Sequence, residues 1–306
     1  MPGPVPLNNN YARPLWLCLV AALLAGCAAP PASPTGGRRA LTDGIGRTVA
    51  VAPEPRRIIS LAPDLTETLF ALGLGERVVG VTSYCDYPAE ARAKEKVGDT
   101  INPDLERIIA LKPDLVLVST SSQLEKITGQ LDRLAIPVYV TNPRSVSQVA
   151  DSIRGLGEVT GARERGVELA DDIGRRARAV AERVAGRPRP RVLYVLQTGP
   201  LITAGRGTFI TDLIRLAGGD SIAAGEAADY PQFSRETVVA RAPEVIIAPA
   251  SHGSELISVE ALRRDFAATP AVRQGRIALV DPNLIDRPGP RIVEGLESVA
   301  RALHPE

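Results

Sequence analysis

Short runs of β-branched and aliphatic residues alternate with amphipathic stretches along most of the chain. The runs have the length and apolar content of strands that are buried on both faces. They form two series, Arg57–Leu61, Val78–Thr82, Leu115–Ser119 and Val138–Val140, then Arg191–Val195, Val245–Ala248 and Ile277–Val280. Because strands that alternate with helices build βαβ units, each series predicts a mainly parallel sheet.

The segment after the first run predicts a helix with a side-chain cap. Asp64 and Glu67 have the spacing of a capping box, in which the two side chains satisfy free N–H groups of the first turn. Leu65 and Leu69 mark the apolar face of this helix. Gly73 is expected to end it, because glycine readily adopts the left-handed conformation that follows many helices.

An internal repeat connects the two series. Residues 104–117 and 234–247 share the order of a capping residue, a glutamate (Glu106 or Glu236), a short helix, a proline, an acidic residue and a strand. Self-similarity of this length indicates duplicated structural units. One pair of copies is too few for a solenoid, so we expect two related lobes that face each other.

Between the two series lies a single long amphipathic stretch. Its apolar residues recur at spacings of four, four, three and four, and so form one stripe of a helix: Leu169, Ile173, Ala177, Val180 and Val184. A helix over 162–185 is about 36 Å long. The predicted fold class is therefore α/β, with two Rossmann-like lobes bridged by a single long α-helix. The alternative is a surface helix that belongs to one lobe. A stiff bridge favours a preformed cleft with little closure.

The N-terminus has the features of an export signal. An apolar run, Leu15–Ala25, follows Arg13 and is too short to span a bilayer comfortably. It ends in Leu-Ala-Gly-Cys, which resembles the lipobox of bacterial lipoproteins, so we expect lipid on Cys27; the alternative is an ordinary signal peptide. The predicted parts are a lipoprotein signal peptide over 1–27, a Pro-rich tether over 28–40, an N-terminal lobe over 41–160, the connecting helix over 161–187 and a C-terminal lobe over 188–306.

Charge and composition exclude several functions. The 36 Lys and Arg residues balance 35 Asp and Glu residues, so the chain lacks the basic excess of a nucleic-acid-binding protein. His252 and His304 are the two histidines, and no nucleophile elbow, Walker loop or zinc-ligand spacing occurs. We therefore expect a binding protein with no catalytic residue, no metal ligand and no cofactor. Cys85 is expected to be a structural residue, with metal contact as the alternative.

The candidate ligand-binding residues lie on loops near the ends of predicted strands, where α/β lobes bind their ligands. Tyr84 and Tyr87 follow the second strand, and Tyr230 precedes the second copy of the repeat. Aromatic rings with polar tips suit a large planar ligand. We expect Tyr84 and Tyr230 to face the cleft and Tyr87 to pack under its own lobe. Arg287 is expected either to donate hydrogen bonds to the ligand or to form a surface ion pair with Asp286 or a neighbour.

Three segments, residues 59–67, 84–88 and 102–106, resemble the BtuF family of cobalamin-binding proteins. This family belongs to the helical-backbone binding proteins of iron-chelate and cobalamin importers, and the likeness extends from about Arg56 to the C-terminus. It implies a monomer, lipid-anchored on the periplasmic side or the outer cell surface, that captures cobalamin or a related corrinoid for an ABC permease dimer with ATPase subunits. It also implies that Glu106 and Glu236 form salt bridges with permease arginines. A symmetric pair of carboxylates suits a two-fold permease.

The resemblance also gives a candidate ligand-binding set: Pro63, Tyr84, Thr100, Ser119, Tyr230, Asn283 and Arg287. Thr100 and Ser119 stand where cobalamin binders of this type can have tryptophan, and Asn283 stands where an acidic residue can occur. With fewer aromatic walls, haem held by a Tyr phenolate and a ferric siderophore held by arginines stay open as alternatives of the same transporter class. A lipid-anchored hydrolase and an envelope scaffold are the alternatives from other classes.

Overall fold

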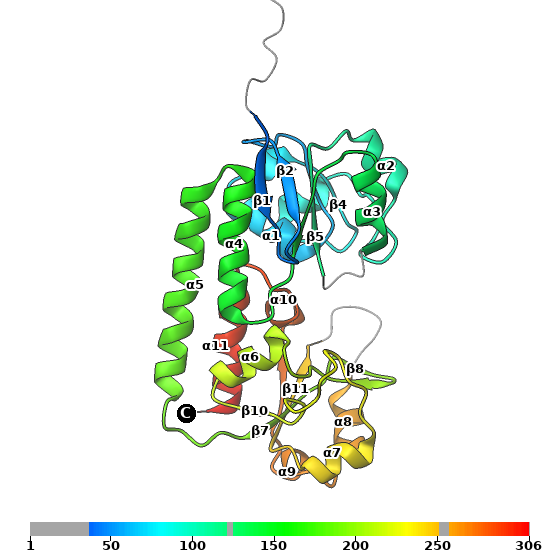
Figure 1. The fold of residues 1–306 in the computed structure, drawn as a ribbon. Helices are drawn as coiled ribbons and strands as arrows, with labels where there is room; N and C mark the ends of the chain where they lie inside the picture. The colour runs from blue at the N-terminus through cyan, green and yellow to red at the C-terminus, as the bar shows by residue number, and fades with distance from the viewer. Residues whose placement is uncertain (1–36, 121–124, 251–256, 306) are drawn as a thin grey trace, which may run out of the picture. The chain divides into compact units, whose positions relative to one another are not determined.

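The computed structural model describes residues 37–120, 125–250 and 257–305, which belong to one compact unit, Gly37–Glu306 (Figure 1). The predicted signal peptide, the lipobox with Cys27, and His252 lie outside the described residues. Within the described ranges, each helix is too short or too polar to cross a membrane.

Four parallel strands form the sheet of the N-terminal lobe. They are β3 (Ile58–Ser60), β4 (Val78–Val81), β5 (Leu115–Ser119) and β6 (Val138–Thr141), in the order β4-β3-β5-β6. Every residue of β3, β5 and β6 is buried, which explains why these strands lack polar alternation. The lobe also contains the antiparallel hairpin β1 (Arg39–Thr42) and β2 (Thr48–Val51), and the helices α1 (Pro63–Ala71), η1 (Gly75–Arg77), η2 (Ala89–Ala93), α2 (Leu105–Ala110) and α3 (Glu125–Arg133).

The sheet of the C-terminal lobe repeats this arrangement. Its parallel strands are β7 (Arg191–Tyr194), β10 (Asp220–Ser221), β11 (Val245–Pro249) and β12 (Ile277–Val280), in the order β10-β7-β11-β12. In both sheets the first strand in the chain lies between the second and the third, so the prediction of two related α/β lobes is confirmed. The remaining elements are β8 (Gln197–Thr198), β9 (Leu201–Ile202), α6 (Phe209–Leu216), α7 (Arg235–Arg241), α8 (Val259–Asp265), α9 (Pro270–Arg273), α10 (Pro282–Ile285) and α11 (Ile292–Leu303).

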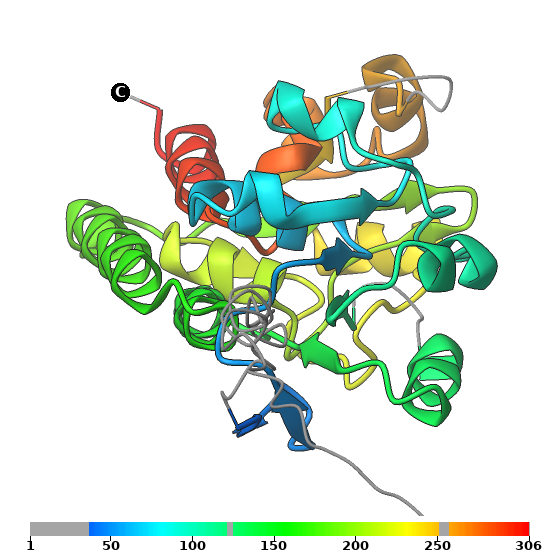
Figure 2. The same ribbon diagram turned by 90° about the horizontal axis from the view of Figure 1, so that it is seen from above.

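The chain crosses between the lobes in one long helix, α5 (Arg163–Val184), which packs against α4 (Val146–Thr160) (Figures 1 and 2). The predicted apolar stripe of α5 belongs to a core that it shares with α4, α6 and α11. Helix α4 adds to the bridge, because its first N–H, that of Val146, donates to Oδ2 of Asp212 in α6 at 2.9 Å. The lobes are thus joined by packed helices as well as by the crossing chain.

Two glycines allow α4 and α5 to approach closely. A Cβ added to Gly157 would lie 2.9 Å from Cα of Gly166 and 3.0 Å from the carbonyl oxygen of Ala162. Because core atoms are already close-packed, a side chain at this position would force the helices apart. Gly161 makes the turn between the two helices with a φ of 79°.

The start of α1 differs from the prediction. The helix begins at Pro63, and its N-cap residue, Ala62, makes no side-chain hydrogen bond. Proline needs no acceptor at the first helical position and already has a helical φ, so the helix starts before Asp64. Asp64 and Glu67 lie inside the helix and are buried. The predicted capping box is therefore wrong, whereas the end is as expected, with Gly73 at a φ of 78°.

Candidate ligand-binding site

The two lobes enclose a narrow cleft. Its N-terminal wall follows the carboxyl ends of β5 and β6, as expected for an α/β lobe. The cavity has a volume of about 60 Å³ and is lined by Ser119, Thr120, Asn142, Pro143, Arg144, Gly207, Thr208, Phe209, Asp229, Tyr230 and Pro288. Two residues of the predicted set, Ser119 and Tyr230, thus lie in one cavity, on opposite lobes.

The cavity that these residues enclose is too small for a large planar ligand. Sites for drug-sized molecules have volumes of about 300–1,000 Å³. An ion pair crosses the cleft at this cavity, because both guanidinium Nη atoms of Arg144 donate to the carboxylate of Asp229. The cleft therefore lies between the lobes, as expected, but it is smaller than the expected preformed site.

A second ionic contact, the clasp, joins the lobes through Glu67, Asp86, Arg287 and Arg291. Arg291 donates from Nε and from Nη2 to the carboxylate of Glu67, at 2.7 Å in each case. Nη1 of Arg287 donates to Oε1 of Glu67 at 3.0 Å and to Oδ1 of Asp86 at 2.8 Å. The clasp fastens α1 and the loop after β4 to the segment between α10 and α11.

Three of the four clasp side chains are largely shielded from water, whereas that of Asp86 is 51% exposed. The side chain of Glu67 is 2% exposed, and those of Arg287 and Arg291 are each 17% exposed. Burial tends to raise the pKa of Asp86, but the hydrogen bond and the charge of Arg287 lower it below its ordinary value. Charged hydrogen bonds of this kind are strong when several partners converge and solvent is absent.

Tyr87 belongs to the clasp region and not to the interior of its own lobe. Its side chain is 46% exposed, and the guanidinium of Arg291 lies 3.8 Å above the centre of its ring. A cation over an aromatic face is held by the quadrupole of the ring. The expectation that Tyr87 packs under its own lobe is wrong, because its partner comes from the other lobe.

Two further carboxyl groups lie close to the clasp, that of Asp64 buried and that of Asp286 partly buried. Burial, with a smaller contribution from the neighbouring carboxylate of Glu67, raises the pKa of Asp64 to about 7. Gly289 packs on the backbone of Asp64, where an added Cβ would lie 3.2 Å from its carbonyl oxygen. Burial also raises the pKa of Asp286 to about 6, although the hydroxyl of Tyr194 donates to its Oδ1.

Cys85 has a packing role in the N-terminal lobe. Its side chain is 1% exposed, and its Sγ lies 3.1 Å from the hydroxyl oxygens of both Thr66 and Thr82. Burial raises the pKa of the thiol, which disfavours the thiolate form that binds metals. In the described part of the chain, no cluster of three or more His, Cys, Asp or Glu side chains is placed to hold a metal ion.

The other predicted ligand residues are more dispersed. Pro63 is the first residue of α1, Tyr84 is 55% exposed after β4, and Thr100 and Asn283 are partly buried. Of the two roles expected for Arg287, the structure shows the ion pair. Its partners are Glu67 and Asp86 and not Asp286. Sequence reasoning missed Arg144 and the clasp, because nothing in the sequence pairs residues that lie in different lobes.

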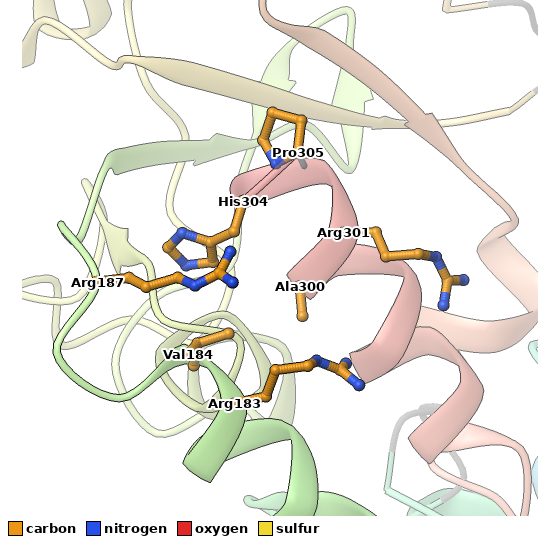
Figure 3. A pocket seen from close by; sticks show the side chains of 7 residues that line it. All are labelled: Arg183, Val184, Arg187, Ala300, Arg301, His304 and Pro305. Carbon is orange, nitrogen blue, oxygen red and sulfur yellow. The ribbon is translucent and has the colours of Figure 1, made fainter.

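A larger cavity, of about 430 Å³, lies away from the cleft at the ends of α5 and α11 (Figure 3). The cavity is lined by His304 and by three arginines, Arg183, Arg187 and Arg301. No acidic residue lines it. Partial desolvation and the charge of Arg187 lower the pKa of His304. The cavity contains no residue of the predicted ligand set, so it is a basic hollow and not part of the cleft.

Comparison with known proteins agrees with this architecture. Residues 58–284 match the family model described as periplasmic binding protein. The chain is 32% identical to the uncharacterized ABC transporter substrate-binding lipoprotein YvrC of Bacillus subtilis, over 95% of this chain and 96% of that protein.

Two solved structures share the fold at appreciable sequence identity. The periplasmic vitamin B12 binding protein BtuF of Vibrio cholerae is 30% identical, with a TM-score of 0.73 over 81% of this chain and 96% of that chain. The periplasmic heme-binding protein RhuT of Roseiflexus sp. RS-1 in apo form is 30% identical, with a TM-score of 0.72 over 81% of this chain and 97% of that chain.

With two parallel-sheet lobes, a helical bridge and a cleft between them, the chain belongs to the periplasmic binding protein family, which is extracytoplasmic. Within that family it is a BtuF-like solute-binding protein with a helical backbone, of the class that serves ABC importers. The resemblance read from residues 59–67, 84–88 and 102–106 is confirmed. In this class a bound tetrapyrrole is transported cargo and not a cofactor.

Proposed function

We propose that the chain captures cobalamin or a related corrinoid between its lobes and delivers it to an ABC permease. The observation that carries this proposal is a pair of half-exposed tyrosines, one on each lobe. Tyr84 is 55% exposed and Tyr230 is 45% exposed. Each offers a flat apolar ring with a polar hydroxyl, which suits the face and rim of a planar macrocycle. The likeness to BtuF supports the ligand class.

Binding requires the cleft to widen on the side of Arg144 and Asp229. Their side chains are 43% and 40% exposed, and an ion pair so exposed stabilises a protein by only about 0–1 kcal/mol. The contact of Glu67 with Arg287 and Arg291 is largely buried and joins the lobes more firmly. Arg144 and Asp229 would thus act as a weak closure that an entering ligand displaces. Pro63, Thr100, Ser119, Asn283 and Arg287 complete the proposed contact set.

Haem is the second candidate ligand. The likeness to RhuT favours it, as do the two tyrosines, since a phenolate can ligate haem iron. Burial raises the pKa of Tyr230, so its phenolate would need the positive charge of the iron to form near neutral pH. Tyr84, which is more exposed, is the better candidate for an iron ligand.

Delivery is proposed to use Glu106 and Glu236 and a lipid anchor on Cys27. Both glutamates are exposed, on α2 and α7. Carboxylates at equivalent positions of two related lobes suit arginines at equivalent positions of a permease dimer with its ATPase subunits. The lipoprotein name of the YvrC relative supports the anchor, which would keep the monomeric protein beside its transporter.

Calorimetric titration of the chain from Ala28 onwards with cyanocobalamin, haemin and a ferric siderophore in parallel tests the ligand. One-to-one heat with cyanocobalamin alone is the expected result. Heat with haemin alone, together with the charge-transfer absorption of a tyrosine-ligated haem, would replace cobalamin with haem. Heat with none of the three would reject the ligand class.

A further inference from the structure

We propose that each lobe docks on the permease through a paired acidic and aliphatic contact, Glu106 with Ile109 and Glu236 with Val239. This inference rests on the proposed delivery to a permease dimer and deepens it, because it adds an apolar contact at each end of the docking surface. The partner it requires is a two-fold permease surface that presents, twice, an apolar recess beside a cationic side chain.

The first observation is that the same position is exposed in both copies of the repeat. Ile109 is 41% exposed and Val239 is 38% exposed, although the preceding residues, Ile108 and Val238, are fully buried. A single exposed aliphatic side chain is ordinary in a soluble protein. The recurrence of one at the equivalent position of the second lobe points to a shared use.

The second observation is the spacing between charge and aliphatic side chain. Glu106 precedes Ile109 by three residues, and Glu236 precedes Val239 by three, so each pair lies on one face of its helix. Helices α2 and α7 both lie on the side of the molecule away from α5 (Figures 1 and 2). The two faces therefore remain clear of the bridge between the lobes.

The third observation is that the same hydrogen bonds hold both helices at their first turn. The carboxylate of Asp104 accepts the N–H of Arg107, and the hydroxyl of Ser234 accepts the N–H of Thr237, both at 3.1 Å. The cap also affects the charge of the second pair. The Glu236 carboxylate accepts hydrogen bonds from the backbone N–H of Glu236 and from the Ser234 hydroxyl. Both bonds lower its pKa and favour the ionised form.

The end of each helix is fixed to its sheet by a matching brace. Asp114 accepts the backbone N–H of Arg57 at 2.9 Å, and Glu244 accepts that of Arg191 at 2.9 Å. The guanidinium of each arginine also reaches back to the end of the helix, where Arg191 Nε donates to the carbonyl of Ala242 at 2.9 Å. The two surface helices thus have the same fixed relation to their sheets, which preorganises both docking faces.

Physical chemistry explains why a carboxylate needs an apolar neighbour here. Exposed charges at the rim of an interface steer association and select partners, but they add little affinity because water and salt screen them. Lasting contact comes from side chains that are fully desolvated on binding. Ile109 and Val239 are the groups beside the two glutamates that would lose water completely when a permease covers these helices.

Photocrosslinking in the host membrane tests the surface directly. A photoreactive amino acid is placed at position 106, 109, 236, 239 or 167 of the full chain, and the captured protein is identified by mass spectrometry. Val167 is the matched control, because it is 41% exposed on α5. The expected result is capture of one and the same permease polypeptide from 109 and 239, and none from 167.

A functional comparison uses the double variant Ile109→Ser with Val239→Ser, and Val167→Ser as control. At subsaturating cyanocobalamin we expect uptake by the double variant to fall about tenfold, with its cyanocobalamin affinity in solution and its circular dichroism unchanged. Val167→Ser is expected to transport at the wild-type rate.

The two hypotheses fail in different ways. Capture of a permease from 106 and 236 but not from 109 and 239, with normal uptake by the double serine variant, would overturn the apolar contact and leave the proposed function intact. Failure to capture a permease from any of these positions, with no uptake by the wild type, would overturn both.

Discussion

Glu67 and Arg291 join the two lobes by a pair of hydrogen bonds, from Nε to Oε2 and from Nη2 to Oε1, each 2.7 Å long. The two residues are 224 positions apart in the chain. Arg287 adds a third bond to the same carboxylate. Because the Glu67 side chain is almost completely buried, water cannot replace a lost partner, and the consequences of breaking this contact are measurable.

Glu67→Gln keeps the shape of the side chain but removes its charge. The variant leaves two largely buried guanidinium groups without their main counter-charge, and we expect its free energy of unfolding to fall by about 3–5 kcal/mol. Urea denaturation measures this value. The control is Glu54→Gln, whose partner Arg56 is exposed, and whose loss costs about 0–1 kcal/mol. A loss for Glu67→Gln no larger than that of the control would show that the clasp contributes little.

Asp64 predicts a dependence of stability on pH. Its folded pKa of about 7 lies above the ordinary value of 3.8, so the folded state retains a proton that the unfolded state releases. The stabilisation is therefore complete below pH about 4 and is lost as the pH rises towards 7, at about 1.4 kcal/mol per pH unit. Asp286, with a folded pKa of about 6, acts in the same direction.

The variant Asp64→Asn isolates this contribution. Asparagine resembles the neutral carboxyl group, so the variant is expected to have a flatter stability profile between pH 4 and 7 than the wild type. Urea denaturation at several pH values provides the comparison. Equal slopes in the two proteins would mean that Asp64 is ionised in the folded state, contrary to the effect of its burial.

Gly157→Ala tests the close crossing of α4 and α5. The added methyl group would lie 2.9 Å from Cα of Gly166. We expect the free energy of unfolding to fall by about 1–3 kcal/mol. Gly174→Ala is the matched control in α5, because its Cβ would meet only the flexible end of Arg178, at 3.6 Å. Alanine there is expected to stabilise the helix by about 0.5–1 kcal/mol. Thermal unfolding of both variants distinguishes the effects, and similar shifts in melting temperature would refute the packing explanation.

The burial of Cys85 predicts an unreactive thiol. In the chain from Ala28 onwards it is the sole cysteine, and in the fold it is buried between two threonine hydroxyls. We expect a thiol reagent such as DTNB at pH 8 to modify the native protein about a hundredfold more slowly than the protein unfolded in guanidinium. Rapid modification of the native protein would instead indicate an accessible, reactive cysteine.

Much of the fold could be predicted because the decisive signals are local. The run Leu115–Ser119 is fully buried and continuous, so its apolar residues alone define the strand, and both ends agree with β5. The stripe from Leu169 to Val184 needs only the helical period, and the repeat needs only comparison of the chain with itself. Each of these signals lies within a window of a few dozen residues.

The parts that escaped prediction depend on contacts between distant residues. Asp64 and Glu67 have the spacing of a capping box, but Pro63 starts the helix and the arginines of the other lobe engage Glu67. Tyr87 was expected to pack under its own lobe, but the partner of its ring, Arg291, comes from the other lobe. Arg144 and Asp229 are 85 positions apart, and no local pattern connects them. The size of the cleft could not be predicted for the same reason.

The position of the clasp residues along the chain also bears on biogenesis. Glu67 is in the first helix, whereas Arg287 and Arg291 come just before the last one, α11. An exported polypeptide that emerges with its N-terminus first therefore presents the Glu67 carboxylate long before either guanidinium has left the translocation channel. Until the final segment emerges, the Glu67 carboxylate lacks both of these counter-ions, so the contact between the lobes is among the last that the folding chain can form.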